Sequence, residues 1–128
     1  MAVMDGRVCP CGLGDNYDSC CGRLHKGEPA RTAGQLMRSR YSAFAVGDTE
    51  YLLRTWHPSS RPRTLTLDAA QQWTRLAVLE THKGGLFDAD GAVRFRAMYT
   101  VDGQRGVLAE TSRFVREDGN WLYLGPVN

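Results

Sequence analysis

The sequence predicts an α+β protein in which a small metal-binding segment precedes one domain of helices and sheet. All four cysteines of the 128 residues fall between positions 9 and 21. Helix signals then occupy residues 32–57, and residues 75–126 carry the β-branched and aromatic residues of an antiparallel meander. Helices followed by a meander are typical of helices packed on one face of a curved sheet. We therefore divide the chain into residues 1–27 and residues 28–128.

The cysteine spacing predicts a closed metal site. Two close pairs of thiols are separated by eight residues, and tetrahedral zinc takes four such ligands. Gly12 and Gly14 lie where a metal-binding turn needs positive φ. His25 is a further candidate ligand, but four thiolates already leave no open position, which indicates a structural ion, either zinc or iron. The predicted ligands are Cys9, Cys11, Cys20 and Cys21.

Two alternatives compete with the metal site. A disulfide between the neighbouring residues Cys20 and Cys21 would be strained, and the compartment inferred below is reducing. A thiolate beside Arg7, Arg23 or Lys26 would be a redox group or a nucleophile. A closed site with four thiolates argues against that role, and the same bases would offset its negative charge.

A first helix is predicted to begin at Thr32, which forms a capping-box pattern with Gln35, and to end at Val46 before Gly47. Arg40 falls on the apolar face of this helix, where a charged group must snorkel, find a buried partner or line a cavity. The predicted core face consists of Leu36, Met37, Tyr41, Phe44 and Ala45.

Shorter helical segments are predicted after Gly47. Asp48 is a good N-cap for a helix that reaches Trp56 and is ended by His57-Pro58. Asp68 to Gln71 resembles another cap, which predicts a third short helical turn through Trp73.

From residue 75 onward the apolar period is two, in the segments "LAVLETH", "AVRFRAMYTV", "GVLAETSRFVR" and "NWLYLGPV". Asp102-Gly103 and Asp118-Gly119 join the last three as hairpins. In the third segment Glu110 shares one strand face with apolar residues, so it is predicted to lie inside and to meet Arg40. The two side chains are expected either to form a buried ion pair that fixes packing or to frame a polar-floored pocket. The candidate pocket residues are Arg38, Arg40, Tyr41, Trp56, His57, Glu110, Ser112 and Phe114.

Two resemblances add to this interpretation. "CPCG", Gly14, Tyr17 and "CCG" resemble the metal-binding knuckle at the C-terminus of the secretion ATPase SecA. The segment departs from that motif at Leu13, Asp15 and Asn16, where the motif tends to have Ser or basic residues, so partner binding through such bases is not implied.

The segments "LMRSRYSAF", "TWHPS" and "ETSRFVREDGNWLYL" resemble the YchJ-like family of bacterial proteins. This resemblance covers nearly the whole chain. It implies a nuclear-transport-factor-2-like fold, in which a cone of helices is closed by a bent antiparallel sheet around a cavity. It does not imply a reaction.

Composition limits the classes of partner. The chain has 42% hydrophobic and 23% charged residues and no apolar run of about 18 residues, so no membrane span is expected. The N-terminal segment "MAVMDGRV" lacks the apolar region of a signal peptide, which favours the cytoplasm. A net charge of +2 argues against nucleic acid, although the knuckle with Arg61 and Arg63 gives a weak version of that hypothesis.

The leading hypothesis is a non-enzymatic, zinc-binding cytoplasmic protein that recognises a protein partner through its knuckle or a small molecule in its pocket. The alternative is an enzyme in which Glu110 or His57 acts as general base. In that case Arg38, Arg40 or Tyr41 would stabilise developing negative charge. The sequence leaves the oligomeric state open.

Overall fold

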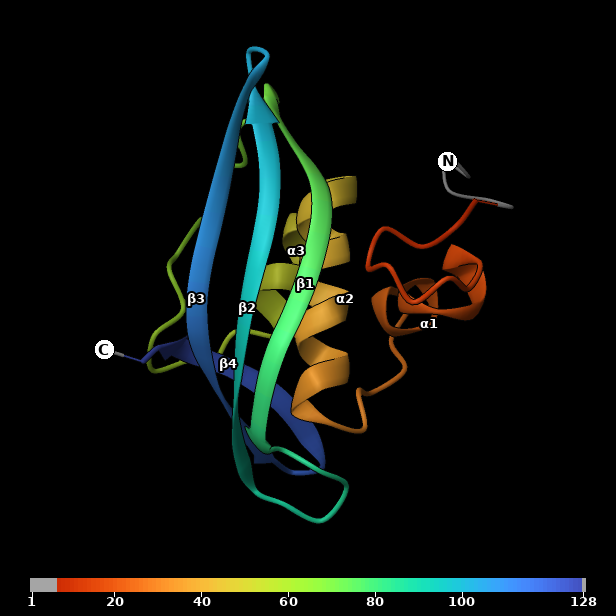
Figure 1. Ribbon diagram of the computed structural model, residues 1–128. Coiled ribbons are helices and arrows are strands. Elements are labelled where there is room, and N and C mark those ends of the chain that lie inside the picture. The colour runs from red at the N-terminus through yellow and green to blue at the C-terminus, as the bar shows by residue number, and fades with distance from the viewer. Residues whose placement is uncertain (1–6, 128) are drawn as a thin grey trace.

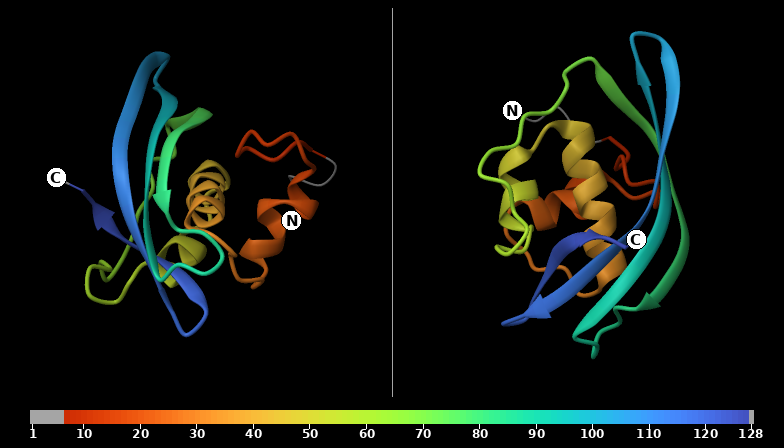
Figure 2. Two further views of the ribbon diagram at one scale, coloured as in Figure 1. Left: turned by 60° about the horizontal axis from the view of Figure 1, so that its bottom comes forward. Right: turned by 90° about the vertical axis from the view of Figure 1, so that its left-hand side faces the viewer.

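The computed structural model describes residues 7–127, so residues 1–6 of the predicted 1–27 segment lie outside it. It confirms the α+β class: a cysteine-containing segment, then helices, then an antiparallel sheet in the order β1-β2-β3-β4. Figures 1 and 2 show three layers, with α2 between the sheet on one side and the cysteine segment on the other. The elements are η1 (Tyr17–Ser19), α1 (Cys21–His25), α2 (Ala33–Val46), α3 (Thr49–Arg54), β1 (Gln71–Lys83), β2 (Asp90–Val101), β3 (Gln104–Glu117) and β4 (Asn120–Pro126).

The ends of α2 are set by the residues that the sequence singles out. The Thr32 hydroxyl accepts a hydrogen bond from the Gln35 N–H at 3.0 Å, and the Gln35 amide oxygen accepts one from the Arg31 N–H at 2.7 Å. Gly47 ends the helix with a φ of 82°, and its N–H donates to the Ala43 carbonyl at 2.8 Å. Local hydrogen bonding therefore fixes both ends of the helix that carries Arg40.

The second predicted helix is also present. It corresponds to α3, and the Asp48 carboxylate accepts a hydrogen bond from the Tyr51 N–H at 3.0 Å. The chain leaves the helix at Thr55, just before His57. A tight turn at Gly47 and Asp48 packs α3 against α2.

The third predicted helical turn is wrong. Asp68 does cap a turn, since its carboxylate accepts from the Ala70 N–H at 2.9 Å, but Trp73 lies within β1. Trp73 pairs with Tyr99 of β2, and the two ring centroids are 5.2 Å apart. Pairing with a strand that is remote in the sequence overrides the local cap signal.

Both predicted hairpin turns are confirmed. Asp102 and Gly103 have φ values of 50° and 80°, and Asp118 and Gly119 have 52° and 79°. Positive φ at both central residues is the type I′ geometry that suits the twist of paired strands. The resulting register places Glu110 opposite Phe95, so both side chains point to the helical side of the sheet.

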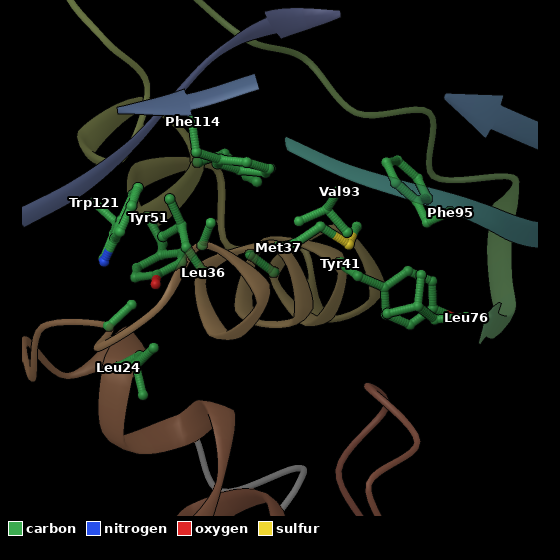
Figure 3. Close-up of a cluster of buried hydrophobic side chains, with 14 of the residues drawn as sticks. Leu24, Leu36, Met37, Tyr41, Tyr51, Leu76, Val93, Phe95, Phe114 and Trp121 are labelled. Carbon is green, nitrogen blue, oxygen red and sulfur yellow. The ribbon is translucent and has the colours of Figure 1, made fainter. Parts of the chain in front are cut away.

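The main core lies between α2 and the sheet, and α1 contributes to it. Leu24 of α1 is 1% exposed and belongs to the same buried cluster as Leu36, Tyr51 and Trp121. Figure 3 shows Leu24 on the side of α1 that faces the end of α2, where Leu36, Tyr51 and Trp121 lie. The cysteine segment therefore shares a core with the domain that follows it.

We expect Leu24→Ala to lower the free energy of unfolding by about 2–5 kcal/mol, because it opens a cavity in the shared core. Urea unfolding followed by circular dichroism measures this change. Leu86→Ala is the matched control, since Leu86 is 54% exposed and its truncation should change little. A loss at Leu24 no larger than that at Leu86 would show that the cysteine segment is not part of this core.

Candidate functional site

The four cysteine sulfurs lie within 4.8 Å of one another, and all four side chains are buried. The Sγ atoms of Cys11 and Cys20 are 3.6 Å apart. Four sulfurs at about 2.3 Å from a tetrahedral ion would be about 3.8 Å apart, so the cluster fits such an ion. Gly12 and Gly14 have φ values of 89° and 95°, which confirms the positive φ expected of the turn.

Charge within the cluster favours a bound cation. Burial raises the pKa of the Cys20 thiol to about 12. Hydrogen bonds within the cluster, above all with Cys11, lower the pKa of Cys9 and raise that of Cys21. One ionised thiol therefore opposes ionisation of its neighbours. A divalent cation removes this opposition, because thiolates bound to a metal are deprotonated outright.

Two side chains of helix α2 contact the cysteine cluster. The Ser42 hydroxyl lies 3.5 Å from the Cys9 sulfur, and the Arg38 guanidinium donates to the Cys11 carbonyl at 3.0 Å. Arg38 is therefore not a pocket residue, which corrects its predicted place. It lies two residues before Arg40, or about 200° around the helix, so the two side chains leave opposite faces.

His25 is outside the metal-ligand set and joins the cysteine segment to α2. Its Nε2 lies 2.9 Å from the Ser39 carbonyl oxygen and donates to it, and its Nδ1 lies 2.5 Å from the Tyr17 hydroxyl oxygen. The His25 ring also packs on the Tyr51 ring at 4.5 Å between centroids. The histidine thus fixes the orientation of α1 on α2.

On its other side, α2 closes a cavity of about 160 Å³ against the sheet. Six of the eight candidate pocket residues border it; Arg38 and His57 do not. Trp73 and Tyr123 also border it, although neither was among the predicted pocket residues. The alternation of aromatic residues in the predicted strand "NWLYLGPV" was an available signal for Tyr123, whereas Trp73 was assigned to a helical turn and not to a strand. The full lining is Met37, Arg40, Tyr41, Phe44, Trp56, Trp73, Phe95, Ala97, Leu108, Glu110, Ser112, Phe114 and Tyr123.

Arg40 is the buried cation of this cavity, with 5% of its surface exposed. It donates hydrogen bonds of 2.7 Å to the Leu52 carbonyl and to the Thr55 hydroxyl. Its guanidinium carbon lies 4.5 Å from the Tyr123 ring centroid and 5.1 Å from that of Trp56. Burial lowers the pKa of Arg40 to about 10, so it remains charged at neutral pH.

Glu110 faces the same cavity from β3. One carboxylate oxygen, Oε2, accepts hydrogen bonds from the Ser112 hydroxyl at 2.5 Å and from the Tyr123 hydroxyl at 3.0 Å. Across residues 7–127, no carboxylate is within 4.0 Å of the Arg40 guanidinium. Arg40 and Glu110 therefore share a cavity without forming a direct ion pair.

His57 lies outside the cavity, which corrects its predicted place there. Its Nε2 is 2.9 Å from the Glu117 carboxylate, and its Nδ1 is 2.8 Å from the Ser59 hydroxyl. The backbone N–H of Ser59 also donates to Nδ1 at 3.1 Å, so Nε2 carries the proton. The turn that follows Trp56 thus holds the ring between Ser59 and Glu117, and His57 does not border the cavity.

Comparison with known proteins identifies relatives along nearly the whole chain. The family described as "YchJ, middle NTF2-like domain" matches residues 32–126. The UPF0225 protein SCO1677 of Streptomyces coelicolor is 53% identical over 116 residues, covering 90% of each chain. The UPF0225 protein CE1570 of Corynebacterium efficiens is 51% identical over 121 residues, covering 93% of this chain and 92% of that protein.

Two solved structures have the same fold. A SEC-C motif containing protein from Rhodopseudomonas palustris, RPA3114, has a TM-score of 0.79 at 30% identity and covers 94% of this chain and 97% of its own. Another, from Psychrobacter arcticus, has a TM-score of 0.79 at 26% identity and covers 97% and 84%. Among residues 7–127, the structure contains no helix with the length and apolar character of a membrane span.

We expect Glu110→Gln to lower the free energy of unfolding by about 1 kcal/mol or less, because glutamine still accepts from Ser112 and Tyr123 and Arg40 keeps its own partners. A double-mutant cycle with Arg40→Met should give a coupling energy below about 1 kcal/mol. Chemical denaturation of the four proteins measures both values. A coupling of about 3 kcal/mol would instead indicate a buried ion pair.

Stability should fall as pH rises from about 10 to about 12. Burial is the main cause that raises the pKa values of Tyr17, Tyr41 and Tyr123 to about 12, and it also raises that of Tyr51. The unfolded chain loses these protons near pH 10 while the folded chain keeps them, so alkali favours unfolding. Arg40, with its lowered pKa, acts in the opposite direction but is one group against four.

Urea unfolding midpoints and tyrosinate absorbance, measured across that pH range on metal-loaded protein, check this expectation. Ionisation of the buried phenols should coincide with unfolding. Tyr41→Phe should lessen the loss of stability, since it removes one of the phenols. Full phenol ionisation near pH 10 with the fold intact would contradict the prediction.

Proposed function

This chain belongs to the UPF0225 family of YchJ-like proteins, and we propose that it is a cytoplasmic, zinc-binding recognition protein. In this proposal the knuckle, residues 7–27 of the described chain, holds a structural zinc ion. The cavity between α2 and the sheet receives a small ligand. The observation that carries the proposal is the shared cavity of Arg40 and Glu110, two charged groups that are not paired with each other.

Burying an arginine without a carboxylate partner costs stability, and proteins retain such groups mainly where they serve a site. The buried indole N–H of Trp56, in the same wall, has no hydrogen-bond partner in the described part of the chain. An unpaired donor of this kind is typical of a site that a ligand or water completes. Both features lie at one end of the cavity, where Tyr123 contacts Arg40 and Trp56.

The size and lining of the cavity indicate the class of ligand. A volume of about 160 Å³ is close to that of cavities that hold a single benzene-sized molecule. The wall away from Arg40 is built mainly from aromatic and aliphatic side chains, which favour a ring or a compact apolar group. We therefore expect a ring-sized, largely apolar molecule with one polar group directed toward Arg40 and Glu110.

The proposed role of zinc is to fix the knuckle on α2. A closed site of four thiolates supports folding rather than catalysis, and zinc adds no redox chemistry of its own. Ligation would hold the Cys9 sulfur beside Ser42 and the Cys11 carbonyl in reach of Arg38. Leu13 and Val8, which are 57% and 64% exposed, would be available to a protein partner on the outer side.

Native mass spectrometry of protein purified from bacterial cytoplasm, under reducing conditions and without chelator, tests both halves of the proposal. We expect one zinc ion per chain and a small-molecule adduct on part of the population. Cys11→Ser should abolish zinc binding. Ala97→Leu should remove the adduct and keep the zinc, because Ala97 is 2% exposed and borders the cavity.

Ala109→Leu is the matched control, since Ala109 is exposed on the opposite face of the sheet and does not border the cavity. It should keep both zinc and adduct. Iron in place of zinc would overturn the metal assignment. Metal-loaded protein with no adduct, or an adduct that survives Ala97→Leu, would overturn the assignment of the cavity.

A further inference from the structure

The face of the sheet that points away from α2 is uncovered. In Figure 1 this outer face of β1, β2 and β3 is turned toward the viewer, with α2 and α3 behind it. In the left view of Figure 2 the sheet bends around α2, which makes its outer face convex. The outer face is therefore available to solvent along most of three strands.

Four arginines project from the middle of this outer face, and a fifth, Arg105, lies opposite Thr100 beside the β2–β3 turn. Arg94 and Arg96 alternate with the buried residues Val93 and Phe95, so their side chains point outward. The register places Arg75 of β1 opposite Met98, and Arg113 of β3 opposite Ala92. We call Arg75, Arg94, Arg96 and Arg113 the arginine row.

The arginine row crosses the sheet obliquely. Its members stand level with successive outward positions of β2, namely 92, 94, 96 and 98. With strands about 4.8 Å apart and about 3.3 Å per residue, neighbours in the row are about 7–8 Å apart and the row is about 20 Å long. The register thus builds a line of single cations from residues that are far apart in the sequence.

Most of this charge has no counterpart nearby. All four arginines are exposed. Glu80 lies 3.5 Å from Arg94, and Asp90, at the border of the face, lies 3.9 Å from Lys83. Within residues 7–127, no carboxylate is within 4.0 Å of the other three guanidinium groups. The whole chain carries only +2, so positive charge is concentrated on this face.

The residues around the row are small or aliphatic. Ala77 and Ala109 flank Arg96 on the two neighbouring strands, Thr111 lies opposite Arg94, and Met98 lies opposite Arg75. These side chains allow a polymer backbone to approach the guanidinium groups closely. His82, which lies opposite Ala92 on β1, places one exposed ring at the end of the row, but none of the residues between the arginines is aromatic. The face therefore offers contacts mainly to charge and not to sequence.

We propose that the arginine row binds the phosphodiester backbone of a single-stranded nucleic acid without sequence preference. A guanidinium group can donate two parallel hydrogen bonds to the oxygens of one phosphate. A line of single arginines therefore suits a polymer that carries one negative charge on each phosphodiester. A flexible single strand can bend along a convex face and reach all four arginines. A rigid duplex or a flat bilayer would contact only the most protruding part of that face. The site is separate from the metal knuckle and from the cavity.

Fluorescence anisotropy with short labelled oligo(dT) and oligo(U) tests this inference on the full-length, metal-loaded protein. Four phosphate contacts to a single strand should give a slope of about −2.8 in log affinity against log salt concentration. Affinity should therefore fall about 50-fold between about 50 and 200 mM salt. Arg96→Gln should weaken binding and bring the slope to about −2.1, because one contact is lost.

Replacing all four arginines of the row by glutamine should abolish binding, and Arg61→Gln with Arg63→Gln is the matched control that should not change it. Thermal unfolding checks that the fourfold variant is folded; if it is not, the slope of Arg96→Gln decides. Three results would overturn the proposal: affinity unchanged by the row variants, tighter binding of a duplex of the same length, or binding of polyglutamate but not of the oligonucleotides. Binding lost in Ala97→Leu would also contradict a site separate from the cavity.

Discussion

Helix α2 must be buried on two sides at once, and the rest of the structure depends on how it meets that constraint. Among the described elements it packs against α1, α3 and the sheet, above all β1, β2 and β4. One face carries Met37 and Tyr41 into the domain core, while Ser42 and Arg38 reach the cysteine cluster. Because both faces are occupied, the cysteine segment and the sheet are held in a fixed relation by one helix. The cysteine cluster on one side and the cavity on the other thus share the same helix.

Polar side chains on α2 are tolerated because each has a specific partner. The Ser39 hydroxyl is fully buried, donates to the Leu36 carbonyl and lies 2.7 Å from the Tyr51 hydroxyl. Arg40 is enclosed by aromatic rings and by hydrogen-bond acceptors at the end of α3. These contacts satisfy buried polar groups that would otherwise be costly, and they allow only one rotation of the helix about its axis.

The sequence predicted the structural features that depend on residues close together in the chain. It missed features that depend on residues far apart in the chain. Thr32, Gly47 and the two Asp-Gly turns act within a few residues, so the ends of α2 and the hairpins could be located. Trp73 was misassigned because its partner, Tyr99, lies in another strand. Arg38 and His57 were wrongly placed in the pocket. Each lies within two residues of a true pocket residue, Arg40 or Trp56, but closeness in the sequence does not determine where a side chain points. The arginine row could not be predicted from the sequence, because its members come from three strands and only the register of the sheet brings them into line.

The strand order of the sheet also bears on how the chain assembles. Each strand pairs with the next in the sequence, and the longest connection within the sheet is residues 84–89 between β1 and β2. Closing such short loops costs little entropy, so the strands can add one after another from either hairpin. Helix α2 comes earlier in the chain, and its contacts with β4 join segments that lie far apart in the sequence. The pairing of the strands is therefore mostly local in sequence, whereas the packing of α2 on the sheet closes a much longer loop of chain.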